Sequence, residues 1–284
     1  MKMKIYLKTS LFIYILLLAN GLHAQSGTFI SLWGGPQLTR MPNNNDYYLS
    51  VNAGYSITPE ETFRSGFGFD YINNFQNTFG WQTGLTYSRE GQVYSADSVG
   101  KDKAFTSGIE MNYIKIPIAY RFNSQFDEGD VLNISIYIGG EFSYLTNVSS
   151  VWSNPPDTIP AKYRGFNFIN LYNRLNFGMV AGTELNWHVK SNKWAYIGVR
   201  YDRSFTNIEK NDYNFPADFP SSWFFPVSTL KVNKPADADM LARPATLPGV
   251  VNVHVGIMIQ IKPGKPPVPI EDNDKPATID ENAQ

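Results

Sequence analysis

The feature that most constrains the fold is a regular alternation of apolar and polar residues near the C-terminal end. Over residues 251–262, every odd position holds Val or Ile, and the even positions hold mostly polar residues. A period of two indicates a β-strand with one apolar and one polar face, whereas a helix would repeat at about 3.6 residues. This stretch predicts a strand much longer than the five to six residues, roughly, of an ordinary sheet.

The same alternation recurs along most of the chain, and no segment offers a convincing helical stripe. Five further stretches are clear, namely residues 79–88, 114–122, 132–142, 174–187 and 195–202, and two weaker ones lie near 27–38 and 63–74. Together with residues 251–262 these stretches make eight long strands. The sequence therefore predicts an all-β protein.

Two kinds of all-β protein fit long two-faced strands, and they differ in where the apolar face points. A soluble sandwich or lipocalin buries that face, whereas a membrane barrel turns it outward to lipid. Aromatic residues make up 15% of the chain and charged residues only 17%, which is low for a surface in water. The apolar faces carry almost no charge, as expected where a charge facing mid-bilayer lipid costs roughly 2 to 4 kcal/mol. The exception, Arg203, lies far enough along its strand to reach the interface. We therefore predict a transmembrane antiparallel β-barrel with lipid around its outer wall.

The connections between the predicted strands indicate strand number and orientation. They fall at 39–62, 75–77, 91–108, 123–130, 147–170, 190–192 and 209–249, and apart from the modest 123–130 they alternate long and short. Outer-membrane barrels have an even number of strands, short periplasmic turns and long extracellular loops. We predict eight strands, an outer-membrane location and periplasmic termini. Residues 47–58 and 222–232 also alternate. These two stretches could form a hairpin above the membrane, or they could be two further wall strands of a ten-stranded barrel.

The two ends of the chain differ in character from the predicted barrel. Residues 1–24 combine a basic head, an apolar run and a small residue at the exit, which is typical of a secretory signal peptide. The barrel would then occupy residues 25–262. Residues 263–284 are rich in Pro and acidic residues and have no apolar pattern, so they predict a flexible periplasmic tail.

Several of these stretches carry a resemblance to a known family. They are residues 79–88, 113–120, 137–140, 177–182, 200–201 and 206–208. Over roughly residues 27–262 the chain resembles the PorT-like outer-membrane β-barrel family of Bacteroidetes-type envelopes. The resemblance implies an eight-stranded outer-membrane barrel with no catalytic motif, and some members of that family are linked to protein secretion machinery.

Composition argues against several classes of function. The formal net charge of -1 does not provide the basic field that nonspecific nucleic-acid binding needs. The chain has no Cys, and His188 and His254, the two His beyond the predicted signal peptide, belong to no metal or hydrolase motif. We therefore predict no catalytic, cofactor or metal site, and a protein that is not an enzyme.

The polar faces carry a set of charged residues that should point into the barrel, namely Lys115, Arg121, Glu141, Arg174, Glu184, Arg200 and Asp202. Counting from the short turns places Glu184 diagonal to Arg200, and Lys115 near Glu141, within reach of long side chains. Because eight strands leave room only for side chains, we expect a salt-bridge network that fills the lumen. A narrow charged conduit is the alternative. Pro117 cannot donate to a ladder, so a β-bulge is expected there.

The connection 209–249 is rich in aromatic residues, which makes it a candidate contact site. Its aromatic residues include Tyr213, Phe215, Phe219, Trp223, Phe224 and Phe225. Exposed aromatic patches often mark contact sites, so this loop either caps the barrel mouth or contacts a protein or glycan partner. The leading hypothesis is a non-enzymatic accessory or scaffold subunit of a larger envelope complex, which binds its neighbours through loops, outer wall or tail. The alternatives are a narrow small-solute channel and an outer-membrane hydrolase.

Overall fold

The computed structural model describes residues 27–41, 55–75, 78–98, 105–124, 132–153, 169–190, 192–208, 210 and 247–263. They form nine strands and one short 3-10 helix, η3 (Ile169–Leu171). The strands are β1 (Gly27–Arg40), β2 (Tyr55–Glu60), β3 (Thr62–Asn74), β4 (Phe79–Ser98), β5 (Phe105–Asn123), β6 (Leu132–Ser153), β7 (Leu175–Lys190), β8 (Lys193–Ser204) and β9 (Gly249–Pro263). No helix in this part of the chain is long and apolar enough to cross a bilayer.

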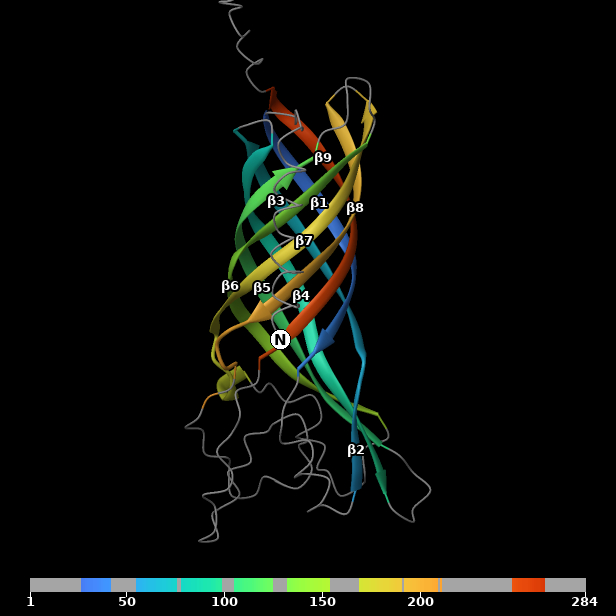
Figure 1. Cartoon of the computed structure of the whole chain (residues 1–284). Coiled ribbons are helices and arrows are strands. Elements are labelled where there is room, and N and C mark those ends of the chain that lie inside the picture. Colours follow the sequence, from blue (N-terminus) through green and yellow to red (C-terminus); the bar gives the residue numbers. More distant parts are fainter. Residues whose placement is uncertain are drawn as a thin grey trace, which may run out of the picture.

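Eight of the strands close into one barrel (Figure 1). Around the wall the order is β1, β3, β4, β5, β6, β7, β8 and β9, each antiparallel to the next, and β9 pairs with β1 to complete the ring. The predicted all-β, eight-stranded barrel is thus confirmed. The ten-stranded alternative is wrong, because β2, which contains part of 47–58, pairs only with β4 beyond the ring. Residues 222–232 lie outside the described part of the chain.

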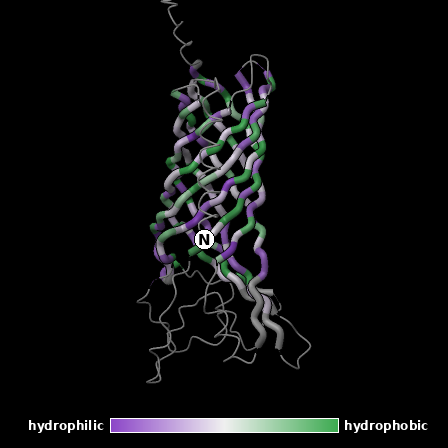
Figure 2. The backbone as a smooth tube through the Cα atoms, viewed as in Figure 1, coloured by the Kyte–Doolittle hydropathy of each residue, from purple (hydrophilic) through white to green (hydrophobic). Residues whose placement is uncertain are grey.

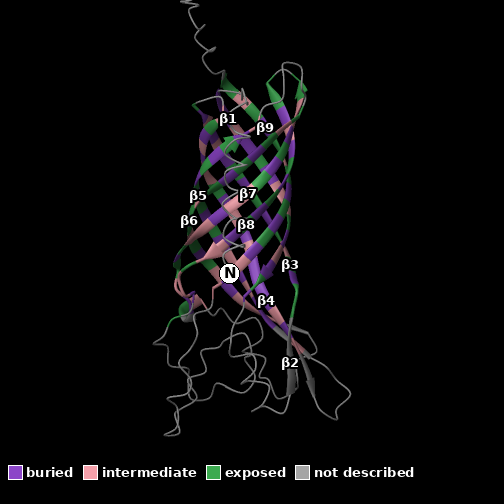
Figure 3. Cartoon of the chain, in the orientation of Figure 1, coloured by how far each residue is buried: buried purple, intermediate pink, exposed green. Residues whose placement is uncertain are grey.

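The two faces of the wall are divided as a lipid-facing barrel requires (Figures 2 and 3). Val253 and Ile257 are 45% and 53% exposed on the outer wall. Gln82, Glu184 and Arg200 are 2%, 6% and 2% exposed in the interior. A protein in water would bury the first group and expose the second, so this wall is built for an apolar surrounding.

The height of the apolar wall matches a bilayer. On β9 the outward positions from Val251 to Ile261 are all Val or Ile. At about 3.3 Å per residue and a tilt of about 40°, this run rises roughly 25 Å along the barrel axis, the height of an outer-membrane apolar band. Outward aromatic pairs lie towards both ends, Phe79 with Phe122 (5.3 Å between centroids) at one and Phe142 with Phe177 (5.0 Å) towards the other. Aromatic girdles of this kind occupy membrane interfaces.

Part of the wall continues past the barrel as an extension of the same sheet, called the projecting sheet below. Residues 93–98 of β4 pair with β2 on one side, and residues 93–96 pair with β5 on the other. Residues 106–112 of β5 pair with 147–153 of β6, where β6 has already passed its last partner on β7, at Tyr144. The four strands extend together beyond the other strands in Figure 1.

This projecting sheet corrects the predicted connections 39–62, 91–108 and 147–170, of which only parts lie between strands. β4 and β5 continue through most of 91–108, and β6 continues to Ser153. The alternation that marks a wall strand depends on lipid on one side. A sheet that extends beyond the apolar band has lost that constraint, so its sequence resembles a loop.

The register shows where the wall bends. Five residues of the β2–β3 segment, 61–65, oppose four of β4, 89–92, which is a one-residue slip where the sheet leaves the barrel. A second irregularity lies between Asn112 and Tyr113. The bulge expected at Pro117 is wrong, because Pro117 pairs in register with Glu141, and the β4–β5 register is the same on either side of it. Because Pro117 has no N–H, the pairing of β4 with β5 is interrupted between Thr83 and Thr86. The carbonyl of Pro117 instead accepts a hydrogen bond from Thr83 Oγ1 (2.8 Å).

Three predicted features fall outside the described residues. They are the signal peptide at 1–24, the tail at 263–284 apart from Pro263 at the end of β9, and the aromatic residues from Tyr213 to Phe225. These remain predictions.

Candidate functional site: the ion-paired lumen

The charged residues of the lumen are buried and lie close to one another. Of the predicted set, Lys115, Arg121, Glu141, Glu184, Arg200 and Asp202 are all at most 6% exposed. Arg174 is the exception, because it is exposed at the rim and donates to the hydroxyl of Tyr144 (3.3 Å). It lies just before β7 begins, where the wall no longer fixes which face a side chain takes.

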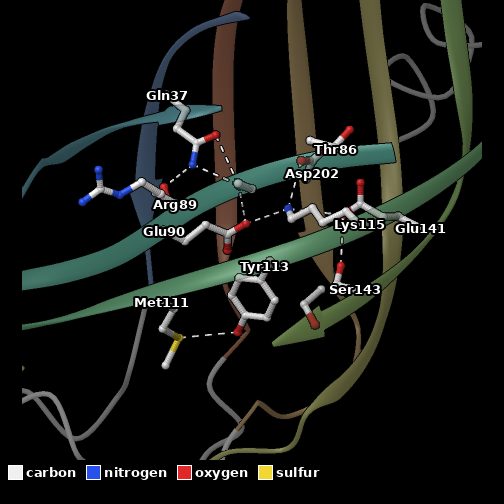
Figure 4. Close-up of polar contacts among 12 residues, drawn as sticks. Gln37, Thr86, Arg89, Glu90, Met111, Tyr113, Lys115, Glu141, Ser143 and Asp202 are labelled. Atoms are coloured by element: carbon white, nitrogen blue, oxygen red, sulfur yellow. Dashed lines mark hydrogen bonds and ion pairs between the residues drawn. The ribbon is translucent and has the colours of Figure 1, made fainter. Parts of the chain in front are cut away.

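Lys115 is the centre of the cluster nearer the projecting sheet (Figure 4). Its Nζ lies 2.7 Å from Glu90 Oε1, 3.2 Å from Glu141 Oε1 and 3.0 Å from Asp202 Oδ2. The four residues belong to β5, β4, β6 and β8, so one ammonium group ties together strands from much of the ring. Such a geometry uses all three donors of a lysine.

Arg200 continues the network towards the middle of the barrel. Its Nε donates to Asp202 Oδ1 (2.7 Å), and its Nη2 donates to Glu141 Oε2. The guanidinium carbon lies 5.6 Å from the centroid of the Trp33 ring, which places the cation against an aromatic face. Trp33 Nε1 in turn donates to Asp70 Oδ2 (2.8 Å).

A second cluster lies nearer the short turns. Arg121 Nη2 donates to Glu184 Oε2 (2.6 Å), Nη1 to Gln82 Oε1 (2.8 Å) and Nε to Asn123 Oδ1 (3.1 Å). Glu184 Oε1 also lies 3.8 Å from Nε2 of His254. Because the His254 ring stands 5.2 Å from Trp33, the two clusters meet at these aromatic rings.

Sequence reasoning placed the charged groups inside but did not find most of their partners. Lys115 does lie beside Glu141, and the register does place Arg200 diagonal to Glu184. The structure nevertheless pairs Glu184 with Arg121, and Arg200 with Glu141 and Asp202. The reason is the width of the barrel. Side chains reach across an eight-stranded lumen to strands that are not neighbours in the wall.

Three interior residues were missed altogether: Asp70, Glu90 and Trp33. Glu90 has the same parity as the inward Gln82, and that signal could have identified it. Trp33 and Asp70 lie on strands whose alternation is weak, so the sequence offered less to assign their faces.

The space left between these side chains is small. One cavity of about 20 Å³ is lined by Lys115, Glu141 and Asp202, and another of about 10 Å³ by Arg121 and Asn186. One water molecule needs about 10 to 15 Å³ on the same measure. Each of these two cavities therefore has room for about one water molecule. The described residues include no group of three or more His, Cys, Asp or Glu able to hold a metal ion.

Comparison with known proteins gives the family. Residues 24–210 match the family described as outer membrane protein beta-barrel domain. Among solved structures, the chain is similar to OprG from Pseudomonas aeruginosa (8% identity, 83% of this chain and 96% of that one, TM-score 0.41). It is also similar to Ail of Yersinia pestis (10%, 82% and 99%, 0.37) and to Neisserial surface protein A (8%, 84% and 99%, 0.37). No curated protein sequence matches. The family match covers more than half of the chain, so this protein belongs to the outer membrane protein β-barrel family and is located in the outer membrane.

Proposed function

We propose that this protein is a non-enzymatic scaffold or accessory subunit of a larger envelope complex, of the PorT-like type. Its termini lie in the periplasm and its projecting sheet lies outside the cell. The resemblance to PorT-like barrels points to secretion or assembly machinery as the kind of complex. Loops, outer wall and the C-terminal tail are the surfaces that remain for neighbouring proteins.

The observation that carries this proposal is the edge of the projecting sheet that is formed by β2. In the described residues, β2 pairs only with β4, so its other edge has no strand partner there. Unpaired strand edges are templates for another chain, and proteins that do not use them usually cover or interrupt them. A partner strand added to β2 would lengthen the sheet without disturbing the barrel.

Pro59 indicates which backbone groups of β2 are free. It stands opposite Tyr94, and having no N–H it must occupy a non-hydrogen-bonded position in that pair. Successive residues of a strand direct their N–H groups to opposite sides, so residues 57 and 59 share a side and the N–H of Ile57 is directed to the open edge. Replacing Ile57 is therefore a way to test whether a partner strand binds this edge.

The experiment is gentle detergent extraction followed by native separation of the full chain. We expect wild type to migrate as a complex well above the 32.1 kDa of the chain itself. Ile57→Pro should shift it towards the single barrel, because it removes an edge donor while sparing the ladder to β4. Ile57→Ala, which keeps the amide, is the matched control and should behave as wild type. A wild-type protein that runs alone would contradict the subunit role.

A narrow channel is the second candidate, and the polar column of the lumen favours it. Charged and amide side chains follow one another from Glu90 through Arg200 and Glu184 to Asn123. Ion conductance of the purified barrel in a planar bilayer separates the two candidates, because only the channel should conduct.

The orientation can be tested independently, because the chain contains no Cys. A single engineered Cys is then the only thiol that an impermeant maleimide can label on intact cells. Ser98→Cys, at the end of the projecting sheet, should be labelled. Asn192→Cys, in the short turn between β7 and β8, should be labelled only after lysis. The reverse pattern would overturn the orientation.

A further inference from the structure

Two arginines flank a glycine on the outer wall. Arg40 of β1 and Arg203 of β8 both stand opposite Gly249 of β9, so the three residues lie in one row across adjacent strands. The parity of each strand directs both arginines outward, and Arg40 is exposed. Gly249 contributes no side chain, which leaves a notch between the two cations.

The polar groups of β8 converge over this notch. A Cβ added at Gly249 would lie 3.4 Å from Arg203 Nη1 and 3.6 Å from Tyr201 Oη. The guanidinium and the phenol hydroxyl are therefore both close to the glycine, and Arg40 stands on its other side. Two donor groups of β8 therefore lie at the glycine, and the exposed Arg40 is paired with it from β1.

Neither arginine has an anionic partner among the described residues. In contrast, Arg89, which also points outward towards the projecting sheet, is bound by the carboxylate of Glu110 at 2.5 Å. The described residues thus supply a counter-charge for one outward arginine and none for the two that flank Gly249. An anion from outside the chain would satisfy them.

The depth of the notch indicates which anion that is. Val251 begins the apolar outward run of β9 only two residues after Gly249. The notch therefore lies at the edge of the roughly 25 Å apolar band, at the level of lipid headgroups. Guanidinium groups bind phosphate through paired, charge-assisted hydrogen bonds, which are stronger than neutral ones.

We infer that Arg40, Arg203 and Tyr201 form a binding site for a phosphate of the phosphorylated glycolipid of the outer leaflet. The choice of leaflet rests on the orientation proposed above, since this edge lies at the end away from Gly27 and Pro263. The site itself is independent of the scaffold role. It gives the barrel a fixed lipid neighbour on the β1–β9–β8 side of its wall.

The test is native mass spectrometry of the full mature chain in detergent, with purified lipid A as the probe. Wild type should retain lipid A, and enzymatically dephosphorylated lipid A should be retained at least about tenfold less, as expected for loss of a charge-assisted pair. Arg40→Gln with Arg203→Gln should lose the phosphorylated lipid to a similar degree. Arg40→Lys with Arg203→Lys should recover part of the binding, because the charges return without the bidentate geometry.

Matched controls keep the result specific to the notch. Lys193→Gln removes an outward positive charge at the opposite end of β8, and Arg89→Gln removes one that already has a carboxylate, so neither should change lipid A retention. Circular dichroism and the heat-dependent gel shift typical of barrels must be unchanged in every variant compared.

Three outcomes would overturn the site. They are equal retention by wild type and the double Gln variant, equal retention of the dephosphorylated lipid, and displacement of lipid A by millimolar inorganic phosphate. The last would show that the notch binds free phosphate. Because the measurement is made in detergent, a failure here is distinct from a failure of the orientation or of the complex.

Discussion

At the scale of single residues, the lumen depends on cations that each hold more than one carboxylate. Arg200 binds both Glu141 and Asp202, and it is 2% exposed. We predict that Arg200→Ala lowers the free energy of unfolding by about 3 to 5 kcal/mol, because two buried carboxylates lose a partner. Lys190→Ala, at the exposed end of β7, should change it by less than about 0.5 kcal/mol. Urea unfolding of the refolded barrel in detergent measures both, and equal midpoints would contradict the pairing.

The pair of Arg121 with Glu184 allows a sharper measurement, a double-mutant cycle. Removing either charge alone leaves the other buried, so Arg121→Met and Glu184→Gln should each destabilise the barrel by about 3 kcal/mol or more. The double variant leaves no unpaired charge and should be less destabilised than the sum of the two singles by at least about 1 kcal/mol. Additive effects would show that the 2.6 Å contact contributes little.

Parity along a strand predicts which side chains point inward, and it did so for six of the seven charged residues that it assigned to the lumen. It does not predict partners. Which residue meets Lys115 across the lumen depends on how eight strands are staggered when the ring closes. That stagger depends on local irregularities such as the register shift between Thr28 and Phe29, in the pair of β1 with β9 that closes the ring, for which the sequence has no clear signal.

At the scale of elements, close contact between β8 and β9 depends on a glycine that faces a tyrosine ring. A Cβ on Gly256 would lie 2.4 Å from Cζ of Tyr196 and 2.6 Å from the carbonyl oxygen of Leu32. Tyr196 cannot simply rotate away, since its hydroxyl is bonded to Ser31 Oγ at 2.7 Å. We predict that Gly256→Ala costs about 1 to 3 kcal/mol by overpacking.

The control for this prediction is Gly140→Ala on the outer wall of β6. A Cβ there would find its nearest neighbour 3.9 Å away, the carbonyl oxygen of Gly178. Replacing this glycine should leave stability unchanged or raise it by about 0.4 to 1 kcal/mol, because the unfolded chain loses freedom. The same urea titration compares the two variants, and a Gly256→Ala protein as stable as Gly140→Ala would refute the packing argument.

The wall strands could be predicted from the sequence because each of them has lipid on one face and the polar lumen on the other. Wherever a strand has lipid outside and a polar lumen inside, as residues 251–262 do, the period of two is strict. Beyond the apolar band that contrast ends, and the far parts of β4, β5 and β6 fall in segments that the sequence predicts as connections. β2 lies partly within the alternating stretch 47–58, so periodicity indicated a strand there but not the sheet that it joins.

At the scale of the whole molecule, the lumen and the outer surfaces have separate roles. In the described lumen, Lys115, Arg121 and Arg200 bind the carboxylates of Glu90, Glu141, Glu184 and Asp202, and Trp33 donates to a fifth carboxylate, that of Asp70. These groups are bound to one another and lie against aromatic rings, which favours a role in stabilising the ring. The surfaces that we propose for contacts with other molecules are the projecting sheet, the Arg40–Arg203 notch and the outer wall.

This division predicts that the purified wild-type barrel does not conduct ions in a planar bilayer. Its cavities of about 20 and 10 Å³ hold isolated waters, and an ion would have to displace Arg200 and Trp33 to pass. Replacing both, as Trp33→Ala with Arg200→Ala, empties the middle of the lumen while leaving most of the carboxylates. If that variant folds, it should open small steps that are selective for cations, because acidic groups then outnumber basic ones. Steady conductance by wild type would favour the channel over the scaffold, and an anion-selective variant would contradict the charge assignment of the lumen.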